Sequence, residues 1–341
     1  MAADLWHLYS LMLRSRLFEE ATARLWTEGR ISGELHLGTG EEAVIAGVVS
    51  HLRHGDAMAL DHRGTSALIM RGADPAPLLR EMLGLHSGMC GGEGGHMHLF
   101  DRALLAAASG IVGAAGPAAA GFALAAQMLR PESVAVAMFG EGAMNQGMVL
   151  ESLNLAAVWK LPVIFMCKDD GWSITTSSPA MTAGTLEGRA AGLGVAAVVV
   201  DGLDAEAVWQ ASQEAVVRAR SGAGPTFLRA RCVHLDAHFL GFPLTRMVED
   251  PLGQGPGMIG SVARAFLSSR GAALAERWRG MKAIAEAVLA TLRDPRRAAG
   301  NDPVARLRAR LSDDDRLREL EGETEREVAA VVDRVLSELP A

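Results

Sequence analysis

The sequence predicts an α/β fold in which a parallel sheet is flanked by helices. Segments 134–170 and 194–232 each read as an apolar strand, an amphipathic helix and a second apolar strand, which is the pattern of a crossover between parallel strands. With 341 residues, of which 49% are hydrophobic, the chain is long enough to cover both faces of such a sheet. At least four parallel strands should therefore share one sheet.

Helical segments precede these strands, and the loops between them carry two candidate site residues. A strand ends near Leu60, and Arg63 lies on the loop that follows it. The glycine-rich segment 30–40 places His36 on a second loop. Three earlier or neighbouring segments have apolar side chains at helical spacing, namely 5–29, 41–53 and 75–85.

One uncharged stretch needs a separate interpretation. No residue from 103 to 129 is charged, and the stretch is long enough to cross a bilayer. Alanine dominates it, however, and several glycines and Pro117 interrupt it, so its transfer into lipid is weakly favourable. We therefore predict a glycine-rich loop followed by a buried helix, and no membrane contact.

The pattern changes after residue 245. Residues 247–300 show little strand signal and several Ala-rich helical segments, including 263–269 and 282–292. Residues 302–339 are charged and helical, with a cap expected at Ser312 and Asp313. The sequence thus predicts two regions, an α/β domain (1–245) and a helical C-terminal region (246–341).

Charge and cysteine content exclude several classes of partner. The chain has 33 Lys and Arg against 40 Asp and Glu, a net charge of −7, so it lacks the basic field that nucleic acid or an anionic membrane requires. Cys90, Cys167 and Cys232 are far apart and form no CxxC pair, which disfavours disulfides and a structural zinc site. We expect a cytoplasmic protein.

Acidic residues follow two successive strands. Glu141 stands between Gly140 and Gly142, and Asp169 and Asp170 end the next strand. Since ligands bind beyond the carboxyl ends of parallel strands, converging carboxylates suit a hard divalent cation that bridges the protein to a diphosphate. The alternative is two solvated acidic turns on an ordinary α/β sheet.

Residues 140–147 and 151–163 resemble the alpha subunit of thiamine-diphosphate-dependent 2-oxo acid and acetoin dehydrogenases. The resemblance runs across most of the chain, and only about 247–300 looks unlike the relatives. It implies a thiamine-diphosphate-binding fold with a helical C-terminal extension. Further matching segments are 40–43, 62–64, 94–98, 110–113 and 237–239.

The same resemblance implies a set of site residues. Glu141 and Asp170 would hold Mg²⁺ through their side chains, and Trp172 would do so through its backbone carbonyl. His36 and His238 match active-centre histidines that handle the substrate and the acyl transfer. The implied contacts to the diphosphate are Arg63, Gly140, Gly142 and Ala143, and those to the aminopyrimidine ring are Gly110 and Val112.

Some residues depart from the family pattern. The family usually has Asp where Glu141 stands and Asn where Asp170 stands, so one ligand is longer and the other carries an extra charge. Because Mg²⁺ demands near-ideal octahedral geometry, we expect weaker cofactor binding, or a preference for Mn²⁺ or Ca²⁺. His62 replaces a frequent Tyr, and Thr65 stands where many relatives have His. A catalytically impaired or repurposed partner subunit is therefore an alternative.

The resemblance also implies partners. In the family, the glutamate that activates the cofactor belongs to a beta subunit, so Glu41 and Glu42 should not have that role. We expect a shared site in an α2β2 assembly, a pyruvate-like 2-oxo acid or acetoin as substrate, and transfer of the acyl group to a lipoyl-bearing acyltransferase. His96 and His98 match a loop of the family, which favours a structural or cofactor-lining role over zinc binding. A nicotinamide-binding dehydrogenase is a weaker alternative because the glycine fingerprint is incomplete.

Overall fold

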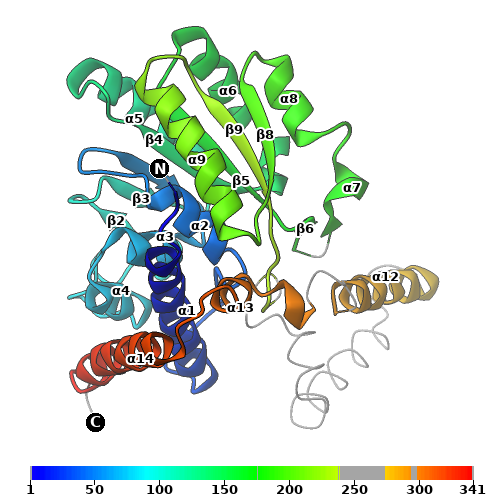
Figure 1. The fold of residues 1–341 in the computed structure, drawn as a ribbon. Coiled ribbons are helices and arrows are strands. Elements are labelled where there is room, and N and C mark those ends of the chain that lie inside the picture. Colours follow the sequence, from blue (N-terminus) through cyan, green and yellow to red (C-terminus); the bar gives the residue numbers. More distant parts are fainter. Residues whose placement is uncertain (1, 175, 237, 239–272, 293–297, 340–341) are drawn as a thin grey trace.

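The computed structural model describes residues 2–339 except 175, 237, 239–272 and 293–297 (Figure 1). Its centre is a seven-stranded sheet, in which only the short pairing of the first two strands in spatial order is antiparallel. The predicted parallel sheet and both predicted crossovers are confirmed. In spatial order the strands are β2 (Phe100–Asp101), β3 (Ala106–Ala108), β1 (Ala57–Leu60), β4 (Ala135–Gly140), β5 (Val163–Asp169), β9 (Thr226–Arg231) and β8 (Ala196–Asp201).

Helices cover both faces of this sheet (Figure 1). Successive side chains of a strand point to opposite faces, so Val136 and Met138 enter one hydrophobic cluster and Ala137 and Phe139 enter the other. The first cluster also takes side chains from α1 (Leu5–Thr27), α2 (Glu42–Val49), α3 (Gly64–Arg71), α4 (Pro75–Met82) and α9 (Ala205–Arg220). The second takes them from α5 (Ala115–Leu129), α6 (Gly147–Trp159) and α8 (Leu186–Gly192).

Short elements follow the carboxyl ends of β4 and β5. A 3₁₀ turn, η1 (Glu141–Asn145), connects β4 to α6. After β5 the chain forms a small hairpin and one helical turn, made of β6 (Trp172–Ser173), β7 (Thr176–Ser177) and α7 (Ser178–Met181). These elements place the acidic residues of both strand ends on one edge of the sheet.

Two of the C-terminal helices, at Pro303–Arg308 and Asp314–Leu336, pack against α1. Tyr9 Oη donates to Glu321 Oε1 at 2.6 Å, and Arg16 Nη1 lies 2.8 Å from Asp302 Oδ2. Asp313 caps the last helix by accepting from the N–H of Arg316 at 3.0 Å, as the sequence predicts. The elements are α12 (Leu274–Leu292), η3 (Ala299–Asn301), α13 (Pro303–Arg308) and α14 (Asp314–Leu336). The predicted helix 263–269 and the predicted boundary at 245 lie outside the described residues, whereas 282–292 lies in α12.

Several elements differ from the sequence prediction. The helices predicted at 5–29 and 41–53 end at Thr27 and Val49. The sequence prediction lacks several short elements, namely β2, β3, α3, β6, β7, α7 and α8. The α3 helix is buried from Gly64 to Met70, so it lacks the amphipathic spacing that reveals a helix. None of the helices that the structure describes combines the length and apolar character needed to cross a bilayer. The three cysteines are free thiols.

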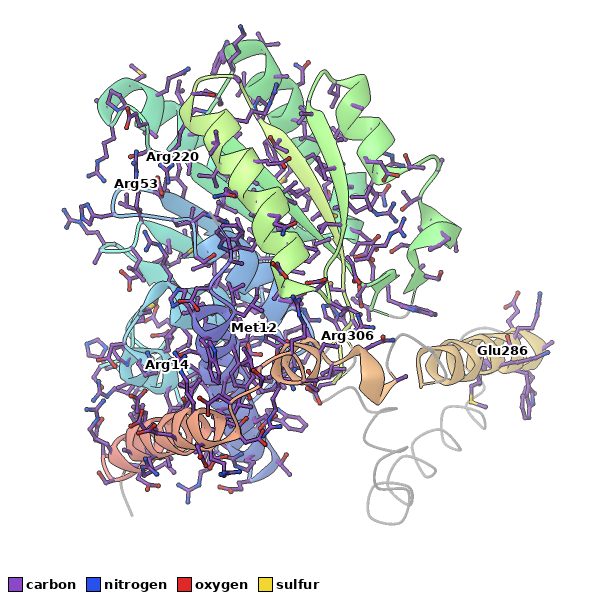
Figure 2. All side chains as sticks on the ribbon, viewed as in Figure 1. Met12, Arg14, Arg53, Arg220, Glu286 and Arg306 are labelled. Atoms are coloured by element: carbon purple, nitrogen blue, oxygen red, sulfur yellow. The ribbon has the colours of Figure 1, made fainter. Side chains whose placement is uncertain are left out.

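A buried carboxylate ties the amino ends of two strands to α9. Asp56 precedes β1 and accepts from the N–H of Val134, which precedes β4, at 2.9 Å. It also pairs with Arg220 Nη2 at 2.6 Å. Arg53 and Arg220 lie near each other (Figure 2), and both side chains donate to the carbonyl of Glu132.

We predict that Asp56→Ala lowers the free energy of unfolding by about 3 kcal/mol or more, because it leaves the buried N–H of Val134 without its acceptor and Arg220 without its carboxylate partner. Urea denaturation measures the change. The control is Glu327→Ala, which removes an exposed ion pair with Arg14 and should cost less than about 1 kcal/mol. Equal losses in both variants would contradict the role given to Asp56.

Candidate functional site

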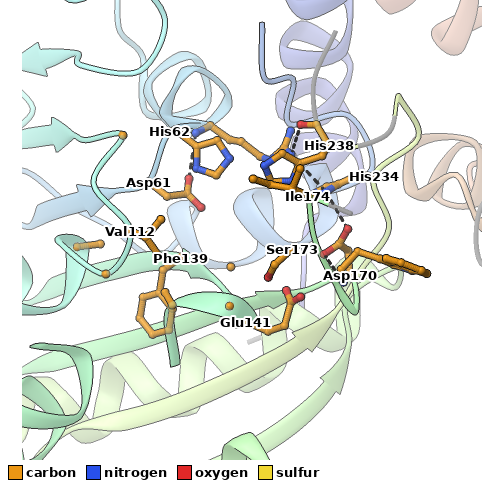
Figure 3. Close-up of a pocket in the computed structure, with 18 of the residues that line it drawn as sticks. Asp61, His62, Val112, Phe139, Glu141, Asp170, Ser173, Ile174, His234 and His238 are labelled. Atoms are coloured by element: carbon orange, nitrogen blue, oxygen red, sulfur yellow. Dashed lines mark hydrogen bonds and ion pairs between the residues drawn. The ribbon is translucent and has the colours of Figure 1, made fainter. Parts of the chain in front are cut away.

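A cavity of about 220 Å³ opens at the carboxyl edge of the sheet (Figure 3). It lies where the segments after β1, β3, β4, β5 and β9 come together, which is the usual ligand position in parallel α/β sheets. All of the cofactor contacts that the resemblance implies line this one cavity, together with His238. They are Arg63, Gly110, Val112, Gly140, Glu141, Gly142, Ala143, Asp170 and Trp172.

Glu141 and Asp170 face the same space because their strands are neighbours. Gly140 of β4 is paired with Lys168 of β5, so the residues that follow leave the sheet side by side. Burial, together with the charge of Asp170, raises the pKa of Glu141 well above its ordinary value. The hydroxyl of Ser178 donates to Glu141 Oε1. Two buried carboxylates that repel each other form a donor set suited to a hard divalent cation.

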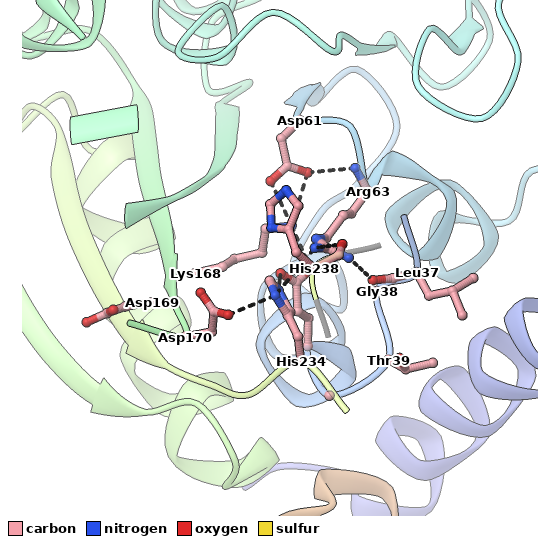
Figure 4. A network of polar contacts seen from close by, with 12 residues as sticks. Leu37, Gly38, Thr39, Asp61, Arg63, Lys168, Asp169, Asp170, His234 and His238 are labelled. Carbon is pink, nitrogen blue, oxygen red and sulfur yellow. Dashed lines mark hydrogen bonds and ion pairs between the residues drawn. The ribbon is translucent and has the colours of Figure 1, made fainter. Parts of the chain in front are cut away.

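Asp170 is balanced by a histidine that the sequence analysis missed. His234 Nδ1 lies 2.9 Å from Asp170 Oδ2, and its Nε2 lies 2.7 Å from Glu41 Oε1 (Figure 4). Burial and Arg63 lower the pKa of His234, but the two carboxylates outweigh them and raise it to about 9. Burial raises the pKa of Asp170, and His234 more than reverses that effect. The extra negative charge at position 170 therefore has a cationic partner.

A buried lysine completes this network. Lys168 Nζ lies 2.6 Å from Glu41 Oε2 and 3.0 Å from Asp61 Oδ2. Burial lowers the pKa of Lys168, but Asp61 and Glu41 raise it above its ordinary value, so the side chain is charged. A lysine inside an otherwise apolar strand is a signal in the sequence that could have drawn attention to this position. His234 gave no comparable signal, since only the fold brings it to Asp170.

Arg63 joins two segments of the site. Its guanidinium is buried, and it donates to the backbone carbonyls of Leu37 and His238, the latter at 2.5 Å. Arg63 also lies 3.4 Å from His234 Nδ1. The loop that precedes α2 and the segment that follows β9 are thus held together by a single cation.

The predicted histidines lie next to each other. The ring centroids of His36 and His238 are 5.3 Å apart, and His62 lies 4.7 Å from His36. Burial, and then the charge of Arg63, lower the pKa of His36 to about 2 and that of His238 to about 3. Neutral imidazoles can both donate and accept a hydrogen bond, as the handling of a substrate hydroxyl or carbonyl requires.

A ring nitrogen of His96 contacts the ring of His36. The loop that carries His96 is held in place by a buried carboxylate. His36 Nδ1 lies 2.8 Å from His96 Nε2. Glu81 is fully buried and accepts the N–H groups of Cys90, Gly92 and Gly94, at 2.7, 2.9 and 2.6 Å. This agrees with the structural role expected for His96. Sequence reasoning missed Glu81, because a single glutamate on an amphipathic helix carries no distinguishing pattern.

Gly110 and Gly142 line the cavity with backbone that carries no side chain. A Cβ at Gly142 would clash with the hydroxyl of Ser173, and a Cβ at Gly110 would lie 3.2 Å from Met97 Sδ. Any larger residue would therefore displace its neighbours, whereas glycine leaves the backbone accessible. Backbone of this kind beside two carboxylates fits a bound metal and diphosphate. The donor set thus matches the cofactor that the resemblance implies.

Comparison with known proteins identifies relatives of the whole α/β part. The sequence profile of the family described as dehydrogenase E1 component matches residues 9–242. The chain is 43% identical over 236 residues to the alpha subunit of acetoin:2,6-dichlorophenolindophenol oxidoreductase of Cupriavidus necator, covering 69% of this chain and 71% of that one. The corresponding Bacillus subtilis subunit is 40% identical over 249 residues, covering 72% and 74%. The pyruvate dehydrogenase E1 component subunit alpha of Zymomonas mobilis is 37% identical over 243 residues, covering 70% and 69%.

We predict that Glu141→Gln stabilises the metal-free chain. A carboxyl whose pKa is raised on folding destabilises the protein as pH rises above the ordinary value of 4.5, so the gain should be absent near pH 4 and about 1 kcal/mol or more at pH 8. Urea denaturation with a chelator present measures it at both pH values.

The matched control is Glu187→Gln. Burial raises the pKa of Glu187, but its own backbone N–H and Arg229 outweigh burial and lower it. Its replacement should therefore destabilise the chain at neutral pH, with the opposite sign. A loss of stability in both variants at pH 8 would refute the repulsion between Glu141 and Asp170.

Proposed function

The chain belongs to the dehydrogenase E1 component family, and from this premise we propose that it is the alpha subunit of a thiamine-diphosphate-dependent dehydrogenase. Its reaction would be the decarboxylation of a pyruvate-like 2-oxo acid or the cleavage of acetoin, followed by transfer of the acyl group to a lipoyl domain. The observation that carries the proposal is the cavity that gathers both acidic strand ends, the glycine backbone and His238, whose ring lies next to that of His36.

The cofactor would be held at the acidic edge of the sheet. Glu141 and Asp170 would bind Mg²⁺, or Mn²⁺ or Ca²⁺, through their side chains, and Trp172 would do so through its carbonyl. Bound thiamine diphosphate supplies an electron sink for breaking the bond next to a carbonyl carbon. The diphosphate would contact Arg63, Gly140, Gly142 and Ala143, and the aminopyrimidine ring would contact Gly110 and Val112.

His36 and His238 would act on the substrate side of the cavity. Their neutral rings would orient a substrate oxygen by donating or accepting hydrogen bonds there. Arg63 would fix the backbone that carries both rings, through the carbonyls of Leu37 and His238. The family relatives suggest acetoin and pyruvate as the substrates to compare.

Apolar side chains at the cavity support a shared site. Ile111, Val112 and Ile174 line the cavity and are 63%, 54% and 52% exposed. Exposed apolar side chains at the rim of a site are typical of surfaces that a partner covers. We infer that a beta subunit closes the cavity, supplies the glutamate that activates the cofactor and forms an α2β2 assembly. A lipoyl-bearing acyltransferase and a cytoplasmic location complete the proposal.

We predict that cofactor binding depends on Asp170. In the chain co-purified with its beta subunit, Asp170→Ala should weaken Mg²⁺-dependent binding of thiamine diphosphate by roughly tenfold or more, because an oxygen ligand is lost. Asp170→Asn keeps an oxygen and should retain binding. Isothermal titration calorimetry in Mg²⁺, Mn²⁺ and Ca²⁺ measures both, with Glu187→Ala as the control. Unchanged affinity in Asp170→Ala would show that the metal site is wrong.

We predict that turnover needs both subunits. The chain alone should show negligible activity on acetoin or 2-oxo acids, and addition of the beta subunit should restore it, because the proposal assigns the activating glutamate to the beta subunit. A spectrophotometric assay with an artificial electron acceptor checks this. Full activity of the isolated chain would exclude a shared site, and an assembly that binds the cofactor without turnover would favour the repurposed partner.

A further inference from the structure

Three histidines from separate segments meet beside the cavity. His36 lies on the loop before α2, His62 follows β1, and His238 follows β9. One ring nitrogen of each lies within 4.8 Å of the corresponding nitrogens of the other two. The ring centroids of His62 and His238 are 5.6 Å apart, and Figure 3 shows both side chains above the acidic pair. These three histidines belong to no common sequence motif, so only the fold brings them together.

We propose that His36, His62 and His238 form a second cation site, which binds a divalent cation of the Zn²⁺ type. Imidazole nitrogen is a preferred ligand of Zn²⁺, whereas Mg²⁺ prefers oxygen, so this site and the carboxylates of Glu141 and Asp170 select different metals. Three histidines with an open fourth position form an established arrangement for Zn²⁺. Tetrahedral Zn²⁺ at about 2.1 Å from each nitrogen needs nitrogens about 3.4 Å apart, which rotations of the rings would have to achieve.

The hydrogen bonds of His36 determine which of its nitrogens carries a lone pair. His96 Nε2 accepts the backbone N–H of His36 at 3.1 Å, so this nitrogen carries no hydrogen. His36 Nδ1 lies 2.8 Å from the same nitrogen and must therefore be a donor. The lone pair of His36 is consequently on Nε2. In metal sites, a histidine ligand is oriented by the hydrogen bond that its other ring nitrogen makes.

His62 brings a buried nitrogen to the same cluster. Its Nε2 has no hydrogen-bond partner among the described residues and is shielded from solvent. A buried polar atom left without a partner destabilises the folded chain, and a bound cation would remove that cost. The exposed histidines His54 and His86 have no such environment.

The surrounding charges do not exclude a cation. Arg63 opposes one, and so does the charged ring of His234, whose centroid lies 6.5 Å from that of His238. Arg63 also holds two of the three segments in place through the carbonyls of Leu37 and His238. Lys168 is paired with carboxylates. The same cavity is lined by four carboxylates, Glu41, Asp61, Glu141 and Asp170. A cation held by His36 and His238 would compete with their proposed action on the substrate, which would make the site inhibitory.

The test is a Zn²⁺ titration of the purified chain in competition with a chromophoric chelator. Neither thiamine diphosphate nor a beta subunit is present, so the result is independent of the proposed function. We expect the wild type to bind a single Zn²⁺, with millimolar Mg²⁺ unable to displace it. His62→Gln should weaken binding by roughly a hundredfold, and His54→Gln should leave it unchanged.

A second measurement distinguishes loss of the metal site from misfolding of the variant. With Co²⁺ in place of Zn²⁺, the wild type should show the strong visible absorption of a four-coordinate site, and both His36→Gln and His62→Gln should lose it while keeping the wild-type circular dichroism spectrum. Equal Zn²⁺ affinity in the wild type, His62→Gln and His54→Gln would assign the metal to surface groups and overturn the proposal. Absence of Zn²⁺ binding and of the Co²⁺ absorption in the wild type would overturn it too.

Discussion

The geometry of the site depends on the buried ion pairs that Lys168 forms with Glu41 and Asp61. Lys168 is 1% exposed, and its two partners, Glu41 and Asp61, lie on the loop before α2 and on the loop after β1. These pairs fasten both loops to the end of β5. Because removal of one member of a buried ion pair leaves the other charge uncompensated, at a cost of about 3–5 kcal/mol, the three groups must be retained together. The second oxygen of Glu41 extends the network to His234 and so to Asp170.

The acidic pair shows a conflict between stability and binding. Burial and mutual repulsion raise the pKa of Glu141, so its charged form destabilises the chain without a bound cation. Asp170 avoids this cost because His234 balances its charge. A carboxylate where the family resemblance leads us to expect asparagine is therefore compatible with the fold. Groups that destabilise a folded chain and bind a ligand are typical of functional sites.

Much of the fold could be predicted from the sequence, for a physical reason. Strands covered on both faces are continuous apolar runs, and the helices between them have amphipathic spacing, so both crossovers were readable. The exceptions are elements without such a pattern. The α3 helix is buried from Gly64 to Met70, and β3 consists of three alanines, whose strand conformation comes from pairing with β1.

The sequence by itself determined the two crossovers, the family and the acidic residues that follow β4 and end β5, because periodicity and collinear motifs are local properties of the chain. Tertiary structure decided which of those residues meet. His234 and Asp170 are far apart in sequence, as are His36, His62 and His238, and their contacts arise only when the ends of β1, β5 and β9 reach one edge of the sheet. Their protonation states follow from burial and neighbouring charge, which depend on distances in space that sequence spacing does not contain.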